Sequence, residues 1–176
     1  KATRRWPQAR HRFKKLLEAD WEPKVFDPDG WWRLSGVRDL DDEGRGMVSD
    51  VLAALDWLLV NHATYQVRVA NISLGKSVDD PLVDDPLVQA VDALVDAGVV
   101  AVVSAGNYGR DGTGTITSPG TSRKAITVGS ITDNGTGDDV SDDYVSSYSS
   151  RGPTLYDTVL KPDILAPGNR VVSAFP

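Results

Sequence analysis

The stretch VVAVVSAGNYG, Val99–Gly109, decides the fold. It opens with five consecutive apolar residues, Val99–Val103, and continues directly into the short sequence SAGN, residues 104–107. An apolar run without polar alternation is typical of a central parallel strand that is covered on both faces. Because ligands of open α/β sheets bind beyond the carboxyl ends of the strands, residues 104–107 are candidates for a functional site.

The segments before this stretch have the pattern of alternating helices and strands. Residues 46–61 carry apolar side chains at helical spacing, and residues 67–74 are rich in β-branched side chains, as strands are. A second helix is predicted to begin after Asp85, which suits the N-cap, with Pro86 in its first turn and Gly98 at its end.

Two further strands are predicted after the central one, at residues 125–131 and 170–174. Strands that alternate with helices of this length favour a parallel sheet with right-handed crossovers. The fold class predicted from these patterns is therefore α/β.

Composition limits the classes of function. The chain has 176 residues, of which 40% are hydrophobic and 25% charged, as expected for one soluble globular domain. It has no cysteine, so disulfides and thiolate metal sites are excluded. No apolar run approaches a membrane span, and no signal-peptide pattern is visible. Because the net charge is −6, we expect no nucleic-acid partner, and we expect no membrane partner.

The first 35 residues differ from the rest of the chain. Residues 1–15 hold seven basic side chains and no acidic one, and tryptophans follow at positions 21, 31 and 32. Trp6, Phe13 and Leu16 are compatible with a short basic amphipathic helix that touches a membrane or an acidic partner. A solvated charge run is the plainer interpretation, and a segment foreign to the rest of the chain is a third.

An acidic segment at residues 132–143 predicts a surface loop. Asp133, Asn134, Asp138 and Asp139 carry oxygen ligands of the kind that calcium prefers. The loop lacks the spacing and the terminal Glu of an EF-hand, so a solvated loop is the alternative to a structural calcium site.

Six separated segments together resemble the subtilisin-like serine proteases, or subtilases. They occur in family order and span about residues 36–176: GVRDLDDEGRGMVSDVLAALDWLL, VRVANISLG, VVAVVSAGN, SPGTSRKAITVGS, YSSRGP and KPDILAPGNRVVSA. The resemblance implies a three-layer subtilisin-like fold, with a parallel central sheet and helices on both faces, incomplete in this chain. It divides the chain into residues 1–35, without resemblance, and a partial peptidase domain at 36–176. It also implies an extracellular or secreted protein.

The resemblance implies roles for particular residues. Asn107 would donate a hydrogen bond to the oxyanion of a tetrahedral intermediate; a simple Gly-Asn turn is the alternative. One wall of a substrate pocket would come from the strand end Ser73, Leu74 and Gly75, and the opposite wall from Ala105 and Gly106, leaving room for a bulky apolar side chain. Ser118, Pro119 and Gly120 would close its floor.

A Ser-His-Asp triad is not identified in the sequence. Ser122 lies in a Gly-Thr-Ser sequence, but the strand AITVGS follows it, and neither His62 nor His11 has the family's His-Gly-Thr-His context. The main hypothesis is a fragment of a serine endopeptidase that carries the oxyanion donor and the cleft, needs no cofactor and is inactive alone. The alternative is a non-catalytic peptide-binding module. A nucleotide-binding domain is disfavoured, because no glycine-rich phosphate loop follows a strand.

Overall fold

The computed structural model describes residues 46–136 and 139–171, and the chain divides into two units, Lys1–Val67 and Arg68–Pro176. The predicted basic segment at residues 1–35 lies outside the described residues. All of the predicted cleft residues and Asn107 belong to the second unit.

The described part of the first unit contains helix α2, Val48–Asn61, close to the predicted range. Its buried side chains, Val51, Ala53, Leu55 and Leu58, follow the helical spacing seen in the sequence. His62 closes the helix, since its backbone N–H donates to the carbonyl of Leu58 at 2.8 Å. The apolar periodicity of the sequence therefore predicted this helix correctly.

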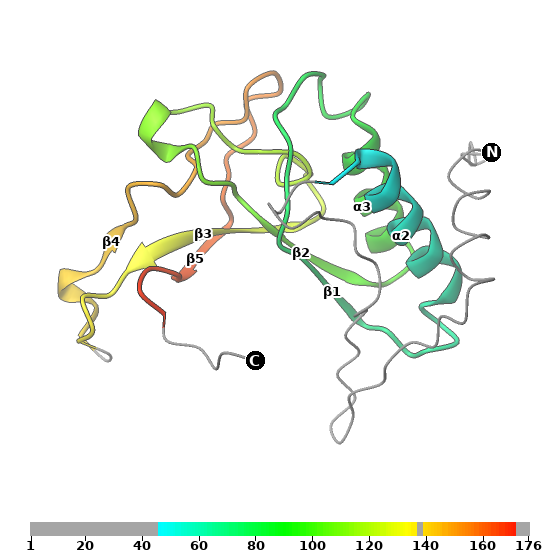
Figure 1. Ribbon diagram of the computed structural model, residues 1–176, viewed down its shortest axis with the longest axis horizontal. Helices are drawn as coiled ribbons and strands as arrows, with labels where there is room; N and C mark the ends of the chain where they lie inside the picture. Colours follow the sequence, from blue (N-terminus) through cyan, green and yellow to red (C-terminus); the bar gives the residue numbers. More distant parts are fainter. Residues whose placement is uncertain (1–45, 137–138, 172–176) are drawn as a thin grey trace. The chain divides into compact units, whose positions relative to one another are not determined.

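Within its described residues, the second unit is built on a sheet of five strands. These are β1 (Val69–Ile72), β2 (Val100–Ser104), β3 (Ile126–Thr132), β4 (Tyr144–Val145) and β5 (Ile164–Pro167). β2 lies between β1 and β3 and runs parallel to both, β5 pairs with β3 in parallel, and the short β4 is antiparallel to β3 (Figure 1). The predicted α/β class and the central place of the VVAVVS strand are confirmed.

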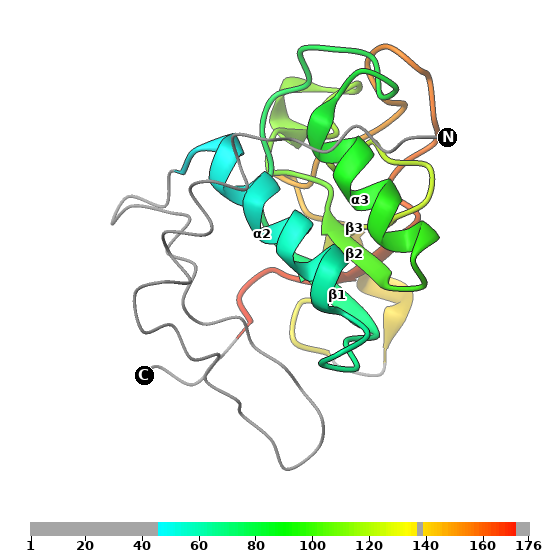
Figure 2. The same cartoon turned by 90° about the vertical axis from the view of Figure 1, so that its right-hand side faces the viewer.

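Helix α3, Pro86–Asp96, connects β1 to β2 and contacts β2 (Figure 2). The carboxylate of Asp85 caps it by accepting the N–H groups of Leu87 at 2.9 Å and Val88 at 3.4 Å. Gly98, at a φ of 92°, follows its end. The start and stop signals in the sequence are thus the ones that the structure uses.

The sheet is covered on one face within the described residues of this unit. Ala101 and Val103 of β2 are each 1% exposed, whereas Val100, which points to the opposite face, is 44% exposed. Val69, beside Val100 in the register, is 55% exposed. Among residues 68–136 and 139–171, α3 is the only α-helix, so this part of the chain does not show the helices on both faces that the resemblance implies.

The strand predicted at residues 170–174 is not found where the structure describes those positions. Arg170 and Val171 belong to no strand, and Arg170 has a φ of 58°, which extended backbone does not adopt. Residues 172–176 lie outside the described residues. The strand that does form, β5, is flanked by Pro162 and ends in Pro167, so its sequence resembles a loop, and its pairing with β3 decides its conformation.

Candidate active site

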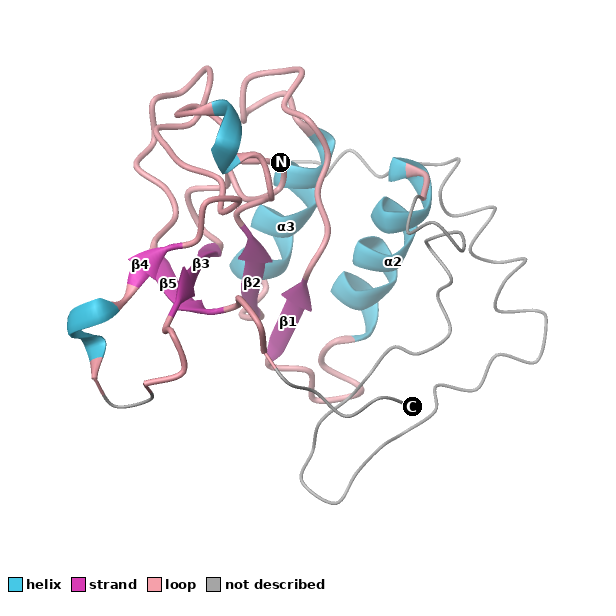
Figure 3. Ribbon diagram, turned by 60° about the vertical axis from the view of Figure 1, so that its left-hand side comes forward, coloured by secondary structure: helices cyan, strands magenta, loops and turns pink. Residues whose placement is uncertain are grey.

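The carboxyl ends of β1 and β2 bring two predicted site segments together. Figure 3 shows the arrowheads of these two strands pointing to the same side, toward the loops that follow them. The segment Ser73–Gly75 follows β1, and Ala105–Asn107 follows β2. The hydroxyl of Ser104 donates to the carbonyl of Leu74 at 3.3 Å. The two predicted walls therefore lie side by side, as the rule for parallel sheets requires.

The third predicted segment, Ser118–Gly120, joins the same place. Lys76 and Ser118 exchange two backbone hydrogen bonds, each of 3.0 Å, so this segment pairs with the chain just after Gly75. A Cβ atom on Gly120 would lie 2.7 Å from the carbonyl oxygen of Ser104. The absence of a side chain at Gly120 is thus what allows the segment to pack against the end of β2.

Thr117 belongs to this cluster, although nothing in the sequence pointed to it. Its backbone N–H donates to Ala105 O at 3.0 Å, and its Oγ1 donates to the same oxygen at 3.3 Å. A Cβ atom would lie 2.6 Å from Thr117 Oγ1 if added at Gly75, and 2.7 Å from it if added at Gly106. Part of the room expected between the two walls is therefore taken by the Thr117 side chain.

Asn107 lies on a turn that is fixed on both sides. Gly106 precedes it with a φ of 106°, a conformation that favours glycine. The carbonyl of Gly106 accepts the N–H of Ser150 at 3.0 Å, and the N–H of Tyr108 donates to Ser150 Oγ at 3.1 Å. Asn107 itself is exposed, and within the described ranges its side chain makes no hydrogen bond. Its carboxamide is therefore free to donate to a ligand.

Ser122 is occupied by structural hydrogen bonds. Its side chain is fully buried, and its Oγ lies 2.5 Å from Asp92 Oδ1. The same oxygen accepts the N–H groups of Lys124 and Ala125, each at 3.1 Å. A hydroxyl with these partners and no access to solvent is not placed to attack a substrate. Of the two histidines considered, His62 ends α2 in the other unit, and His11 lies outside the described residues.

An ion pair that the sequence did not reveal, between the buried Lys161 and the exposed Asp163, lies at the amino ends of β3 and β5. Lys161 Nζ donates to Asp163 Oδ2 at 2.6 Å and to Ala125 O at 2.9 Å, and Asp163 Oδ2 also accepts the N–H of Thr127 at 2.7 Å. Burial alone raises the pKa of Asp163, but the hydrogen bond from Lys161 and the Thr127 amide outweigh it and lower the pKa below its ordinary value. The pair holds these two strands together.

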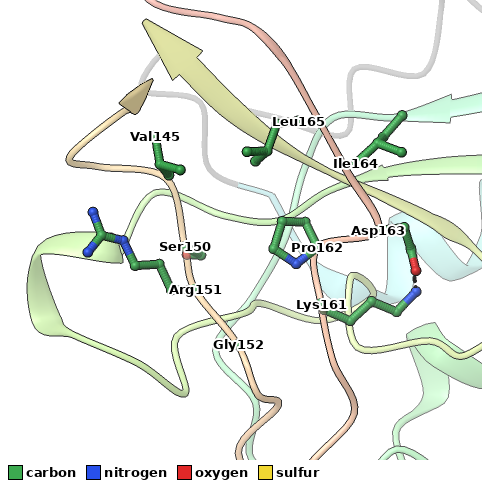
Figure 4. A pocket seen from close by; sticks show the side chains of 9 residues that line it. All are labelled: Val145, Ser150, Arg151, Gly152, Lys161, Pro162, Asp163, Ile164 and Leu165. Atoms are coloured by element: carbon green, nitrogen blue, oxygen red, sulfur yellow. Dashed lines mark hydrogen bonds and ion pairs between the residues drawn. The ribbon is translucent and has the colours of Figure 1, made fainter. Parts of the chain in front are cut away.

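This ion pair borders a cavity of about 740 Å³ (Figure 4). Its lining residues are Val145, Ser150, Arg151, Gly152, Lys161, Pro162, Asp163, Ile164 and Leu165. Figure 4 shows the Arg151 side chain pointing away from Lys161 and Asp163. Besides the Lys161–Asp163 pair, Arg151 is the one charged residue among those that line this cavity.

A second ion pair ties the chain after Gly75 to the start of α3. Lys76 Nζ lies 3.1 Å from Asp79 Oδ2 and 3.5 Å from Oδ2 of the fully buried Asp85. Burial alone lowers the pKa of Lys76, but the hydrogen bond to Asp79 and the charge of Asp85 outweigh it and raise the pKa. The chain that follows the predicted wall at Gly75 is thus anchored directly to the cap of α3.

The calcium prediction at residues 132–143 rests partly on a residue that the structure does not describe, Asp138. Asp133 Oδ1 accepts the N–H of Gly135 at 3.1 Å, and Asp139 Oδ1 accepts that of Ser141 at 3.0 Å. The side chain of Ser141 and its backbone N–H together lower the pKa of Asp139. Among residues 46–136 and 139–171, no group of three or more His, Asp or Glu side chains is placed to hold a metal ion. A structural calcium remains a prediction.

For the described part of the chain, no helix combines the length and the apolar character that crossing a bilayer requires.

Comparison with known proteins gives a consistent result. The model of the subtilase family matches residues 33–175. The chain is 42% identical over 145 residues to the serine protease AprX of Bacillus subtilis (strain 168), covering 80% of this chain and 32% of that protein. It is 38% identical over 142 residues to an extracellular serine proteinase of Thermus sp. (strain Rt41A), covering 81% and 29%. The chain therefore spans about a third of the length of these relatives.

Solved structures agree with the sequence matches. Sphericase superimposes with a TM-score of 0.62 at 30% identity, covering 77% of this chain and 43% of its own. The S41 psychrophilic protease superimposes with a TM-score of 0.55 at 30% identity, covering 73% and 41%. The α/β fold described above is therefore shared with proteins of this kind.

Proposed function

Because the chain belongs to the subtilase family of subtilisin-like serine proteases, we propose that its second unit supplies an oxyanion donor and a substrate cleft for the hydrolysis of peptide bonds. One observation carries the proposal. Asn107 is exposed beyond the central strand β2, on a turn fixed by Ser150, and its carboxamide has no hydrogen-bond partner among the described residues. A preorganised amide of this kind stabilises negative charge that develops on a carbonyl oxygen.

In the proposed mechanism, a serine hydroxyl attacks the substrate carbonyl while a histidine accepts its proton and an aspartate orients the histidine. The carbonyl oxygen becomes an oxyanion, and the side-chain N–H of Asn107 donates to it. We identify no triad member among the residues of this chain, so we expect the chain alone to be inactive or nearly so. An oxyanion donor without a nucleophile gives only weak assistance to water attack.

The proposed substrate is an extended polypeptide. The Ser73–Gly75 segment follows a strand, and its backbone would pair with that of the substrate while a side-chain pocket selects between peptides. Thr117, between Gly75 and Gly106, would limit the depth of that pocket. We also propose that the protein is secreted, in keeping with the name of its extracellular relative from Thermus.

A non-catalytic peptide-binding module is the second candidate. Two observations favour it. Hydrogen bonds hold the three proposed cleft segments together, so the surface that would bind a peptide is formed. The Ser122 hydroxyl is buried and bonded within the protein, so it does not serve as a nucleophile. Such a protein would bind extended peptides and would not cleave them.

The experiment combines hydrolysis, labelling and binding on the purified 176-residue chain. A fluorogenic peptide reports hydrolysis, a serine-directed phosphonate reports a reactive serine, and calorimetry reports peptide binding. We expect peptide binding without labelling and with little hydrolysis. Hydrolysis that stops when the phosphonate labels a serine of this chain would show that the chain holds its own nucleophile. If neither binding nor hydrolysis occurs in a folded sample, the cleft proposal is wrong.

A further inference from the structure

Ser150 makes both of the hydrogen bonds that fix the residues on either side of Asn107. Its N–H donates to the carbonyl of Gly106 at 3.0 Å, and its Oγ accepts the N–H of Tyr108 at 3.1 Å. Ser150 is 1% exposed, so water does not compete for these bonds. One buried residue, 43 positions further along the chain, therefore holds the turn that carries Asn107 at both of its ends.

The hydroxyl of Ser150 also packs directly against the turn. A Cβ atom on Gly106 would lie 2.8 Å from Ser150 Oγ, so there is no room for a side chain between the turn and this hydroxyl. The Asn107 side chain is exposed and has no hydrogen bond of its own among the described residues. The direction of its carboxamide thus depends on the backbone to which it is attached, and that backbone depends on Ser150.

The neighbouring Ser149 shows what a purely structural serine looks like here. It is also 1% exposed, and its Oγ also accepts a backbone N–H, that of Ser130 in β3, at 2.9 Å. Neither its hydroxyl nor its backbone bonds to residues 106–108. The two serines are therefore matched in burial and in hydrogen bonding, and they differ in whether the hydroxyl acts on the turn of Asn107.

We propose that Ser150 is a positioning residue, which holds the Asn107 carboxamide in the direction needed to meet an oxyanion. The inference rests on the oxyanion role proposed for Asn107, but the geometric part of it is measurable without catalysis. Removal of the Ser150 hydroxyl, which is a buried acceptor, leaves the Tyr108 N–H without a hydrogen-bond partner. The turn is then free to change its backbone angles. The catalytic donor would then be present but misdirected.

The test compares Ser150→Ala with the matched control Ser149→Ala in the isotope-labelled 176-residue chain. NMR couplings report the χ1 populations of Asn107, amide exchange reports the Tyr108 N–H, and urea unfolding reports stability. In the wild type we expect one dominant Asn107 rotamer and a protected Tyr108 amide. In Ser150→Ala we expect averaged rotamers and Tyr108 exchange about tenfold faster or more. In Ser149→Ala both should match the wild type, although stability falls by a similar amount.

Several results would overturn the proposal. If the Asn107 side chain already samples several rotamers in the wild type, the proposal is wrong, and this result can be obtained even if neither variant folds. Unchanged Asn107 couplings in Ser150→Ala, or equal changes in both variants, would reduce Ser150 to a structural residue. In a peptide-hydrolysing form of the protein, Ser150→Ala should lower kcat roughly 10–100-fold at unchanged KM. An unchanged kcat for Asn107→Ala in that form would count against the proposed function and leave the NMR outcome for Ser150 intact.

Discussion

The side chain of Thr117 takes the space beside Gly75: a Cβ atom added at Gly75 would lie 2.6 Å from Thr117 Oγ1. A Cβ atom added at Gly106, on the opposite predicted wall, would lie 2.7 Å from the same hydroxyl oxygen. Two glycines that are distant in sequence thus share one neighbour, and that neighbour lies between the two walls of the proposed substrate pocket. The identity of residue 117 should therefore influence which substrates fit.

The first prediction is that Thr117→Gly enlarges the space between the two walls. Peptides with a bulky apolar side chain should bind about tenfold more tightly or better, since one or a few methylene-sized groups in a pocket are worth about 1–3 kcal/mol. Thr117→Ser keeps the hydroxyl that donates to Ala105 O and removes only the methyl, so its gain should be smaller. Calorimetric titration with a pair of peptides that differ at one side chain measures the effect. Equal affinities for both peptides in Thr117→Gly would show that Thr117 does not border the binding site.

The second prediction concerns Asn107→Ala. Because this side chain is exposed and makes no hydrogen bond among the described residues, the free energy of unfolding should stay within about 0.5 kcal/mol of the wild type. In a peptide-hydrolysing form, kcat should fall about 10²–10³-fold, the loss seen when subtilisin, a member of the same family, is deprived of its oxyanion-hole asparagine, and we adopt that magnitude. Urea unfolding and steady-state kinetics measure the two effects. A large loss of stability would mean that Asn107 is structural.

The third prediction separates backbone strain from close packing at two glycines. Gly98 and Gly106 both have positive φ, 92° and 106°. An added Cβ meets nothing within 4 Å at Gly98, whereas at Gly106 it meets Thr117 Cγ2 at 2.7 Å and Ser150 Oγ at 2.8 Å. Gly98→Ala should cost about 1–2 kcal/mol, from strain alone.

Gly106→Ala should cost about 1–3 kcal/mol more than Gly98→Ala, because it adds overpacking to the strain. It should also remove peptide binding, since the turn that carries Asn107 must move. Urea unfolding of the two variants side by side gives the comparison. Equal costs would contradict the close contact described for Gly106.

The fourth prediction is a pH dependence that arises from Asp163. Its pKa is lowered in the folded protein, so it stabilises the fold fully above the ordinary carboxyl pKa of about 4, and this contribution is lost as the pH falls below that value. Asp163→Asn should therefore be less stable than the wild type at pH 7, and the gap should narrow below about pH 4. Urea unfolding at several pH values measures it. A gap that stays constant down to pH 3 would show that the Lys161 pair does not act on this carboxyl.

The fifth prediction compares two aspartates that contact Lys76. Asp85 is fully buried, caps α3 and lies 3.5 Å from Lys76 Nζ, whereas the Asp79 side chain is 69% exposed. Asp85→Ala should cost about 2 kcal/mol, near the upper limit for loss of a cap, because it also leaves Lys76 with one partner fewer. Asp79→Ala should cost about 1 kcal/mol at most, as exposed ion pairs do. Thermal unfolding of both variants checks this, and a larger loss for Asp79→Ala would contradict the assigned anchor.

Local patterns were sufficient for the elements whose residues specify their own conformation. The apolar spacing of α2, the Asp85 and Gly98 signals of α3 and the continuous run of β2 each appear in a short window of sequence, and the structure confirms them. β5 was not predicted, because its own residues do not specify its conformation. Prolines surround its apolar residues, and pairing with β3, which is distant in sequence, makes it a strand.

The sequence by itself therefore determined the α/β class, the central strand and the position of Asn107 just beyond its carboxyl end. These follow from side-chain periodicity and from helix caps, which depend on near neighbours. Only the tertiary structure decided that Thr117 stands between Gly75 and Gly106, and that Ser150 holds the turn of Asn107. Both relationships depend on hydrogen bonds and van der Waals contacts between segments that are far apart along the chain, and no local pattern encodes such contacts.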